Sequence, residues 1–322
     1  MKKMLMAKGA RTIVEVCAGT KAGEKAVIVT EPCMLEMAEA IAAAVIAVGA
    51  EPTITVMPPR ASDGQEPPAP VAAAMKASDV FFNVVNKSIT HTRATREAAE
   101  AGSRGMMMTQ FSEGMLMGGG ITADFKTIAP QCEAVAQALA GAESIHLTTP
   151  HGTDLRFSAT GRRGNALTCL IGPGQFTTVP TVEANVSPLE GTAEGVIVAD
   201  ASLPYIGIGL LQEPIVAKVE KGMIVSLSGG KQAEMLRQNW ESKNDPLVYN
   251  VAELGVGLNP QCSFIGCMLE DEGVYGSVHI GTGTNITLGG HTKAACHYDL
   301  IMTGATIVAD GRTVLKDGKV VL

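Results

Sequence analysis

The fold class is decided by residues 26–57, which read AVIVTEPCMLEMAEAIAAAVIAVGAEPTITVM. Residues 26–30 form a continuous apolar run, as expected for a strand buried on both faces. The alanine-rich segment 34–48 has the length and composition of a helix, and Gly49 stands where a helix commonly ends. A second strand is predicted at 52–57. A strand, a helix and a second strand in this order predict a parallel pair joined by a crossover helix.

The same alternation continues to about residue 140. Further buried strands are predicted at 80–85 and 105–109, and helices at 71–76, 92–101 and 130–140. This pattern predicts an α/β domain with a doubly wound, mainly parallel sheet over residues 1–142. Neither a GxGxxG motif after the first strand nor a GxxxxGK motif occurs. We therefore expect this domain to serve as a scaffold or lid rather than to bind a cofactor.

The pattern changes near residue 142, where short β-rich segments separated by glycine-containing turns become dominant. Strands are predicted at 144–149, 154–159, 193–199, 215–220 and 222–227, one helix at 231–239, and a closing hairpin at 305–322. We therefore expect a second domain over residues 143–322, a β-rich α+β domain.

Charge and cysteine content exclude several classes of protein. The net charge is −7, no Lys/Arg-rich run occurs, and aromatic residues make up 4% of the chain, which argues against binding to nucleic acid or anionic membranes. The seven cysteines are scattered without a CxxC pair, as in a reduced thiol population. No apolar segment is long enough to span a bilayer, and the basic N-terminus lacks the apolar core of a signal peptide. We expect a soluble, cytoplasmic protein.

The candidate chemistry is concentrated in a glycine-rich stretch, residues 275–303, which holds three of the six histidines. In the triplet His297-Tyr298-Asp299, the imidazole and the carboxylate fall on one face of an extended strand, because side chains alternate with period 2. With His279 a short loop away, they could form half of a metal site. The alternative is that His297 is a core histidine and Asp299 begins a turn, since an H-x-D triplet is common.

Two glutamates stand in apolar surroundings without a neighbouring Lys or Arg. Glu183 lies in PTVEANVSP, between Pro180 and Pro188, and Glu253 lies in VAELGVGLNP. Burying an unpaired carboxylate is costly, so a buried glutamate at either place needs a cation or a hydrogen-bond partner, and a metal ion would serve. The alternative is that each glutamate is exposed on an edge strand.

The order of these residues resembles that in the aminopeptidase T family, also called thermophilic metallopeptidases. These are two-metal exopeptidases with an α/β N-terminal domain and a β-rich metal-binding domain. Three further motifs extend the resemblance over most of the chain: HTRATREA from His91, GTDL from Gly152 and PLEGTAEG from Pro188. Carried over residue by residue, the resemblance implies five metal ligands: Glu183, Glu253, His279, His297 and Asp299.

This resemblance also implies a reaction. A pair of divalent ions such as Zn, Co or Mn would be bridged by Glu253 and would activate a water molecule against an amide bond. The substrate would be a small molecule or the N-terminus of a short peptide, and the protein would be a homodimer. We therefore expect a metallohydrolase, with no catalytic side chain assigned beyond the ligands.

One departure from the peptidases concerns a tyrosine that they carry a few residues after the histidine matching His279. Here the segment HIGTGTNI places Asn285 or Ile286 in that region. The alternation that pairs His297 with Asp299 points Tyr298 to the opposite face of the strand. We expect Tyr298 to pack rather than to catalyse.

The end of the chain is similar to a second branch of the same fold, the 2,5-dihydroxypyridine dioxygenases. Residues 289–299, GGHTKAACHYD, match the ending of that branch, which uses one ferrous ion held by two histidines and an aspartate. In that branch a histidine occupies the position matching Glu253. Because all five peptidase-type ligands are present, a hydrolase is the main interpretation. The alternatives are an Fe(II) ring-cleaving dioxygenase acting on a hydroxylated N-heterocycle such as 2,5-dihydroxypyridine, and a non-catalytic protein that binds a small ligand.

Two other segments have simpler interpretations. The run Glu270-Asp271-Glu272 is expected to be a solvated acidic turn, because consecutive carboxylates repel one another and favour water. The run Met106-Met107-Met108 is expected to lie in a buried strand, since thioethers that bind metal need to be exposed.

Overall fold

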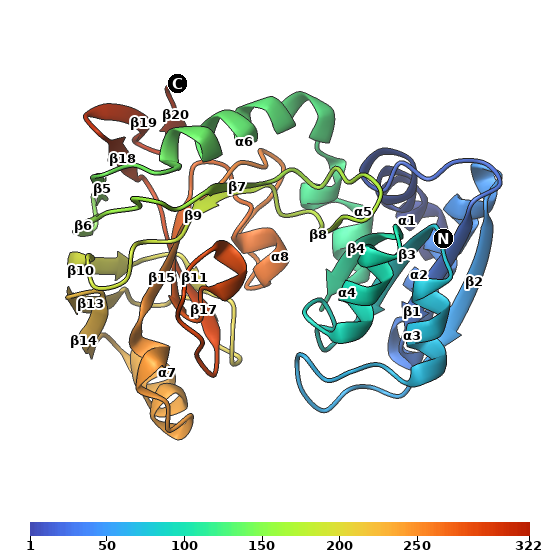
Figure 1. The fold of residues 1–322 in the computed structure, drawn as a ribbon, viewed down its shortest axis with the longest axis horizontal. Coiled ribbons are helices and arrows are strands. Elements are labelled where there is room, and N and C mark those ends of the chain that lie inside the picture. Colours follow the sequence, from blue (N-terminus) through green and yellow to red (C-terminus); the bar gives the residue numbers. More distant parts are fainter. The chain divides into compact units, whose positions relative to one another are not determined.

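The structure is a computed structural model that describes residues 1–322. The chain forms two compact units, whose elements are labelled in Figure 1. Unit 1 comprises Met1–Thr127 and Cys169–Pro180, and unit 2 comprises Ile128–Thr168 and Thr181–Leu322. This division differs from the single boundary expected near residue 142, because a later segment returns to unit 1 and adds a strand to its sheet.

Unit 1 contains the parallel sheet that the sequence predicted. Its strands, in the order in which they pair, are β2 (Glu51–Val56), β1 (Lys25–Thr30), β3 (Val80–Val85), β4 (Arg104–Thr109) and β8 (Phe176–Thr178). Every pairing in this sheet is parallel. The chain runs from β1 to the edge strand β2 and then crosses back past β1 to β3 and β4, so the doubly wound α/β class is confirmed. Met106, Met107 and Met108 are buried in β4, as predicted.

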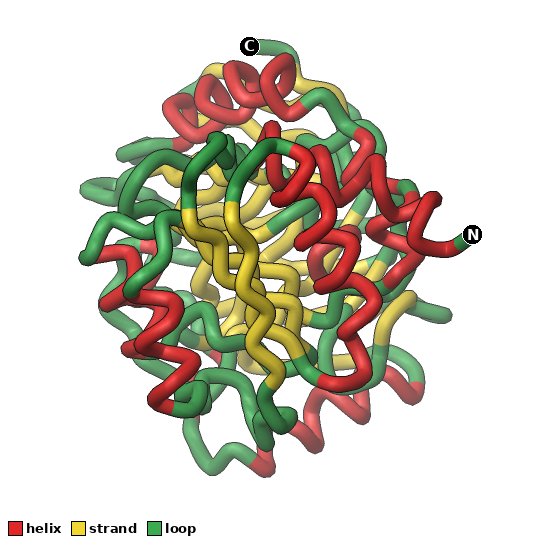
Figure 2. Tube along the Cα trace, turned by 90° about the vertical axis from the view of Figure 1, so that its right-hand side faces the viewer, coloured by secondary structure: helices red, strands yellow, loops and turns green.

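Helices lie on both sides of the strands of unit 1 (Figure 2). They are α1 (Lys2–Arg11), η1 (Thr12–Cys17), η2 (Pro32–Met34), α2 (Leu35–Ala47), α3 (Ala69–Lys76), α4 (Arg93–Glu100), α5 (Glu113–Met117) and η3 (Gly119–Thr122), followed by α6 (Phe125–Leu139), which ends in unit 2. Val27 and Val29 of β1 pack with Val71 and Met75 of α3 in one buried cluster. Ile28, which projects to the other face of the sheet, is also fully buried. Such two-sided burial explains the continuous apolar run that predicted this strand.

Some elements of unit 1 were not predicted. The N-terminal segment forms α1, which continues into the π-helix η1. Its basic residues, including Lys8 and Arg11, are exposed, whereas Met6 and Ile13 are fully buried. The strand β8 was missed because three residues are too few to show an alternating pattern.

Unit 2 contains two antiparallel sheets. The first has eight strands, in the order β14 (Met223–Ser228), β13 (Ile215–Glu220), β10 (Glu194–Ala199), β6 (Asp154–Phe157), β5 (Ile145–Thr148), β18 (Thr306–Ala309), β19 (Arg312–Lys316) and β20 (Lys319–Val320). The strands predicted between residues 144 and 227 and in the closing hairpin all belong to this sheet. Their clear alternation is the reason they could be predicted.

The second sheet of unit 2 has seven strands and positions the candidate site. Its order is β12 (Gly209–Leu210), β11 (Ser202–Leu203), β17 (His297–Met302), β16 (Val278–Gly283), β15 (Val251–Gly257), β9 (Glu183–Val186) and β7 (Gly164–Leu167). The helices of this unit are α7 (Lys231–Ser242), η4 (Pro246–Tyr249), α8 (Met268–Asp271) and η5 (Ile286–Leu288). Across both units, no helix combines the length and the apolar character that a bilayer crossing requires.

Candidate metal centre

Four neighbouring strands of the seven-stranded sheet bring the five predicted ligands onto one face. Glu253 of β15 pairs with Gly281 of β16, which pairs in turn with Asp299 of β17. The other three predicted ligands are also paired with glycines: His279 with Gly255, His297 with Gly283 and Glu183 with Gly257. Residues paired across antiparallel strands project to the same side of a sheet, so all five side chains share one face.

The glycines on this face leave the space that the ligand side chains occupy. A Cβ atom on Gly255 would lie 2.0 Å from His279 Nε2, and one on Gly281 would lie 2.6 Å from His297 Nε2. Both distances are far shorter than a non-bonded contact between carbon and nitrogen allows. A residue with any side chain at either glycine would therefore displace an imidazole.

The five side chains form two groups that share Glu253. One group is Glu183, Glu253 and His279, and the other is Glu253, His297 and Asp299; within each group, one ligand atom per residue lies within 4.8 Å of the others. His297 Nε2 lies 2.9 Å from Glu253 Oε2 and 3.3 Å from Asp299 Oδ1. His279 Nε2 lies 3.9 Å from Glu253 Oε1 and 3.5 Å from Glu183 Oε2. Glu253 thus lies between the two imidazoles, with one oxygen toward each.

Burial and mutual charge shift the protonation of these groups. Burial raises the pKa of Glu183 to about 7. For His279, burial acts in the opposite direction, but the neighbouring carboxylates of Glu253 and Glu183 outweigh it and raise the pKa to about 9. Burial would raise the pKa of Glu253, yet the neighbouring His279 and His297 lower it below its usual value. In the metal-free protein, protons on the imidazoles thus compensate the buried negative charge.

These residues fit a divalent cation. Three buried atoms have no hydrogen-bond partner: Glu183 Oε2, Asp299 Oδ1 and His279 Nδ1. Both carboxylate oxygens belong to the two groups and lie 3.5 Å and 3.3 Å from an imidazole Nε2, so a bound cation could replace the imidazole protons in compensating their charge. Imidazole nitrogens combined with carboxylate oxygens are the donors that Zn, Mn, Co and non-haem Fe(II) accept. Residue groups capable of holding a metal ion are therefore present.

The orientation of His297 is fixed by the backbone. Its Nδ1 lies 2.7 Å from the carbonyl oxygen of Thr284. A carbonyl oxygen only accepts hydrogen bonds, so Nδ1 carries the hydrogen and donates it. This contact leaves Nε2 to face Glu253 and Asp299, as in metal-binding histidines whose second nitrogen is held by a neighbouring acceptor.

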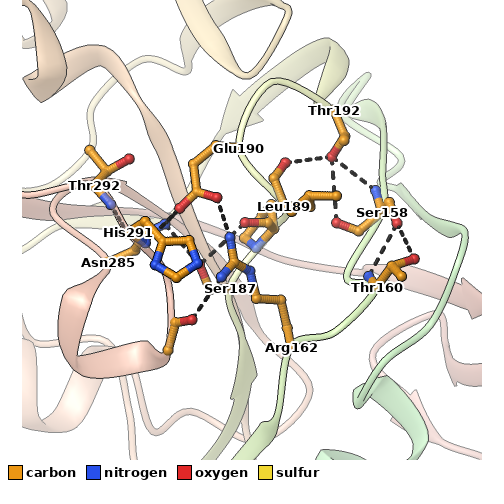
Figure 3. A network of polar contacts seen from close by, with 12 residues as sticks. Ser158, Thr160, Arg162, Ser187, Leu189, Glu190, Thr192, Asn285, His291 and Thr292 are labelled. Atoms are coloured by element: carbon orange, nitrogen blue, oxygen red, sulfur yellow. Dashed lines mark hydrogen bonds and ion pairs between the residues drawn. The ribbon is translucent and has the colours of Figure 1, made fainter.

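A polar network holds the β16–β17 loop, residues 284–296 (Figure 3). Arg162, whose side chain is 4% exposed, pairs with Glu190. Glu190 Oε1 accepts hydrogen bonds from the side-chain amide of Asn285 at 2.9 Å and from the backbone N–H of His291 at 2.8 Å. The carbonyl oxygen that accepts the hydrogen bond from His297 belongs to Thr284 in this loop. The loop is thereby linked through Glu190 to the buried Arg162.

Asn285 lies in the region where the peptidase resemblance placed a tyrosine, and its side chain is used within this network. Its Nδ2 donates to Ser187 Oγ at 3.0 Å and to Glu190 Oε1 at 2.9 Å, and its Oδ1 accepts from Thr292 N at 2.8 Å. The residue is fully buried. Both of its side-chain N–H groups are engaged, so Asn285 does not replace a tyrosine as a donor to substrate.

Tyr205 contacts the site and was missed by the sequence analysis. Its hydroxyl lies 2.6 Å from Asp299 Oδ2 and 2.7 Å from Glu272 Oε1. The phenol has one hydrogen and can donate to only one of these two carboxyl groups. The other contact is a hydrogen bond only if that carboxyl group is protonated and donates to the phenol oxygen. Burial and the charge of Asp299 raise the pKa of Glu272 well above its usual value, so Glu272 is the group that carries it.

The expectation of a solvated turn at Glu270-Asp271-Glu272 is wrong. All three residues are buried, with exposed fractions of 2%, 0% and 8%. Each carboxyl group has its own partner: Glu270 accepts from the N–H group of Ser263, Asp271 accepts from the N–H groups of Ile265 and Gly266 as well as from Ser202, and Glu272 contacts Tyr205. Local hydrogen bonds stabilise buried charge, and these donors come from segments that the acidic run itself does not reveal.

Tyr298 packs away from the ligands, as the alternation of β17 predicted. Its ring lies 5.1 Å from that of Tyr205, and its hydroxyl donates to Asn239 Oδ1 at 3.0 Å. The side chains of His297 and Asp299 lie on the opposite face of the strand. Tyr298 thus supports Tyr205 rather than the ligands directly.

Comparisons with known proteins relate this chain to oxygenases. The sequence model of a family described as 2,5-dihydroxypyridine 5,6-dioxygenase matches residues 6–322. The chain is 30% identical over 197 residues to the 2,5-dihydroxypyridine 5,6-dioxygenase of Pseudomonas putida KT2440, an alignment that covers 56% of this chain and 55% of that protein. The chain thus aligns with about half the length of this curated relative.

Two solved structures share the fold. A 2,5-dihydroxypyridine dioxygenase from Pseudomonas putida KT2440 superimposes with a TM-score of 0.82 at 21% identity, covering 98% of this chain and 96% of the other. Wild-type AmpT from Thermus thermophilus superimposes with a TM-score of 0.72 at 17% identity over the full length of both chains. At such identities the likeness describes the fold alone.

The family match overturns the main interpretation of the sequence. A metallohydrolase of the aminopeptidase T family was expected, and that expectation is wrong, because the matching family over nearly the whole chain is one of dioxygenases. The expected hydrolase, aminopeptidase and metalloprotease activities are wrong for the same reason. The expectation rested on a ligand set, and similar imidazole and carboxylate donors serve both hydrolytic and oxygen-activating metals.

Proposed function

Because the chain belongs to the 2,5-dihydroxypyridine 5,6-dioxygenase family, we propose that it is a ring-cleaving dioxygenase. Its substrate would be a hydroxylated N-heterocycle such as 2,5-dihydroxypyridine. The structural observation that carries the proposal is the group of Glu253, His297 and Asp299 on adjacent strands of one sheet, in which both carboxylates are buried and the imidazole is partly exposed. A small group of carboxylate and imidazole ligands is the kind of site that holds non-haem Fe(II) in oxygenases.

The proposed metal is a single ferrous ion. His297 and Asp299 correspond to ligands that the dioxygenase resemblance implies, and Glu253 stands where that resemblance places a histidine. The distances of 2.9 Å and 3.3 Å from His297 Nε2 to the two carboxylates support this set over the looser group around His279. Bound Fe(II) would supply the binding and activation of dioxygen. The protein's own residues supply a pre-oriented site, in which the carboxylates are at least nine-tenths buried and Nδ1 of His297 is held by the carbonyl oxygen of Thr284.

Oxygen consumption tests this proposal. The protein is purified without chelator, its metal content is measured, and the metal-free form is loaded anaerobically with Fe(II). Addition of 2,5-dihydroxypyridine in air should then consume one molecule of dioxygen per molecule of substrate, and both atoms of ¹⁸O₂ should appear in the product. Iron-loaded protein that consumes no oxygen with any of a set of mono- and dihydroxypyridines would overturn the proposal.

A variant at Glu253 tests the assigned site. Glu253→Gln removes the negative charge between the two imidazoles, so Fe(II) affinity and oxygen uptake should each fall by more than about 100-fold. The matched control is Glu241→Gln, which makes the same chemical change at an exposed position of α7 and should leave both quantities unchanged. Full iron content and activity in Glu253→Gln would show that the metal lies elsewhere.

A further inference from the structure

We propose that Tyr205 is a positioning residue for Asp299, and that Glu272 anchors Tyr205. The inference rests on the proposed metal site, in which Asp299 is a ligand. Neither Tyr205 nor Glu272 belongs to the two groups of candidate ligands. Their contact with the site is through one hydroxyl group, which lies 2.6 Å from Asp299 Oδ2 and 2.7 Å from Glu272 Oε1.

The hydrogen bond from Tyr205 gives the two oxygens of Asp299 different roles. Oδ2 accepts from the phenol, whereas Oδ1 is buried without a hydrogen-bond partner and lies 3.3 Å from His297 Nε2. Rotation of the carboxylate would break the first contact and move Oδ1 away from the group that it shares with His297. Tyr205 therefore holds the unpartnered oxygen where a cation would bind, which is how neighbouring hydrogen-bond donors orient metal ligands.

Tyr205 is itself held from several sides. Its ring packs on that of Tyr298 with the centroids 5.1 Å apart and the planes inclined by 38°. Its backbone N–H donates to the carbonyl of Leu203 at 2.8 Å, and the next residue, Ile206, has a φ of +49°. A β-branched residue in the left-handed region is a genuine conformational outlier, and such outliers are concentrated at functional sites. The turn after β11 thus accepts an unfavourable backbone conformation directly beside Tyr205.

Glu272, the residue that follows α8, completes the arrangement from a different part of the chain. It is 8% exposed, and it contacts the same hydroxyl that reaches Asp299. The phenol has one hydrogen to donate, and Asp299 must be ionised to bind a cation, so in the metal-bound protein the hydroxyl donates to Asp299 and accepts from a protonated Glu272. The direction of the Tyr205 hydrogen bond is thereby set by Glu272.

Cobalt binding to the metal-free protein tests the role of Tyr205 without relying on catalysis. Co(II) is titrated anaerobically, and its visible absorption reports both affinity and coordination geometry. Tyr205→Phe should weaken Co(II) binding by about 10- to 100-fold and shift the absorption bands, since the ligand loses its orienting donor. Tyr249→Phe removes a hydroxyl from a ring that packs on Trp240 and should behave as wild type.

A second variant isolates Glu272. Glu272→Leu removes the partner of the Tyr205 hydroxyl, so Co(II) binding should weaken and its spectrum should shift as in Tyr205→Phe. Glu272→Gln keeps a neutral group that can donate to the phenol oxygen and should retain both. Wild-type affinity and spectrum in Glu272→Leu would contradict the anchoring role of Glu272.

The outcomes separate this inference from the proposed function. Wild-type affinity and an unchanged spectrum in Tyr205→Phe would overturn the positioning role, whatever the enzyme's activity. Wild-type protein that binds metal tightly but consumes no oxygen would overturn the proposed function and leave the role of Tyr205 intact. Wild-type protein that binds no metal would overturn both.

Discussion

Glycine is as necessary to the candidate metal centre as the ligands are. In VAELGVG and VHIGTG, one face of the strand carries a single acid or histidine followed by two glycines at every second position of β15 and β16. Each ligand thus has a residue without a side chain opposite it on the neighbouring strand. Glycine weakens the interior of a strand, so its repeated use on one face indicates that the space is needed.

Adding one methyl group to this face should disrupt the site. In Gly255→Ala the new Cβ atom would lie 2.0 Å from His279 Nε2. The imidazole must then move, so we expect metal affinity to fall by more than about tenfold, with overpacking costing about 1–3 kcal/mol of stability. Gly118→Ala is the matched control, because its Cβ atom would meet nothing within 4 Å and its φ lies outside the left-handed region. Isothermal titration with Co(II) and thermal melts compare the two variants, and equal affinities would contradict this account.

Individual site residues could be predicted only where the sequence around them showed a recognisable motif. The five candidate ligands could be named because they occur in motif-like surroundings on strands, and the structure brings them together; their binding of metal stays a prediction. Tyr205 lies in a turn without a pattern, and Glu272 ends a run of acids whose donors are distant in sequence. Residues that act through contacts between distant segments leave no local signal.

Among the elements, the strands and helices with clear periodic patterns were predicted, whereas the helix α1, the strands β15 and β16 and the shortest strands were not. The strands of the parallel sheet and of the eight-stranded sheet show apolar runs or clear alternation. β9 was foreseen only as an extended segment holding Glu183, and β7, β11 and β12 were not foreseen at all. Two- to four-residue strands owe their conformation to pairing with neighbours, and pairing is a property of the fold rather than of the segment.

The loop between β16 and β17 should loosen when Asn285 is truncated. Asn285→Ala removes the donors to Ser187 and Glu190 and the acceptor for Thr292, leaving buried polar groups unpaired at a cost of about 1–3 kcal/mol. Hydrogen exchange of residues 284–296 should become faster, because the opening free energy of the loop falls. Gln238→Ala, which truncates an exposed amide on α7, is the control. Unchanged exchange in the Asn285 variant would show that the loop is held by other contacts.

At the scale of the whole molecule, the fold class could be predicted and the division into units could not. Strand–helix alternation followed by β-rich segments predicted an α/β part and a β-rich part, both of which are present. The chain passes between the two units more than once, because β8 returns to pair with β4 of unit 1. The amino-acid composition gives no sign of this return. The homodimer implied by the family resemblance also stays a prediction, which sedimentation of the purified protein would test.

The pH dependence of the molecule's stability follows from the protons held at the metal-free site. The pKa of His279 is raised from 6.5 to about 9, and that of Glu183 from 4.5 to about 7. Between pH 6.5 and 9 the folded protein therefore binds more protons than the unfolded chain, so the free energy of unfolding of the metal-free protein should fall as pH rises through this window. A metal ion competes with the same protons, so Co(II) affinity should rise over that window, and saturating Co(II) should stabilise the protein more at pH 9 than at pH 6.5. Urea unfolding at both pH values, with and without Co(II), measures the two trends. His279→Gln, which cannot take up the proton, should make the metal-free trend shallower without abolishing it, because the pKa of His297 is also raised well above its usual value by Asp299 and Glu253. An unaltered trend in that variant would assign the protons to other groups.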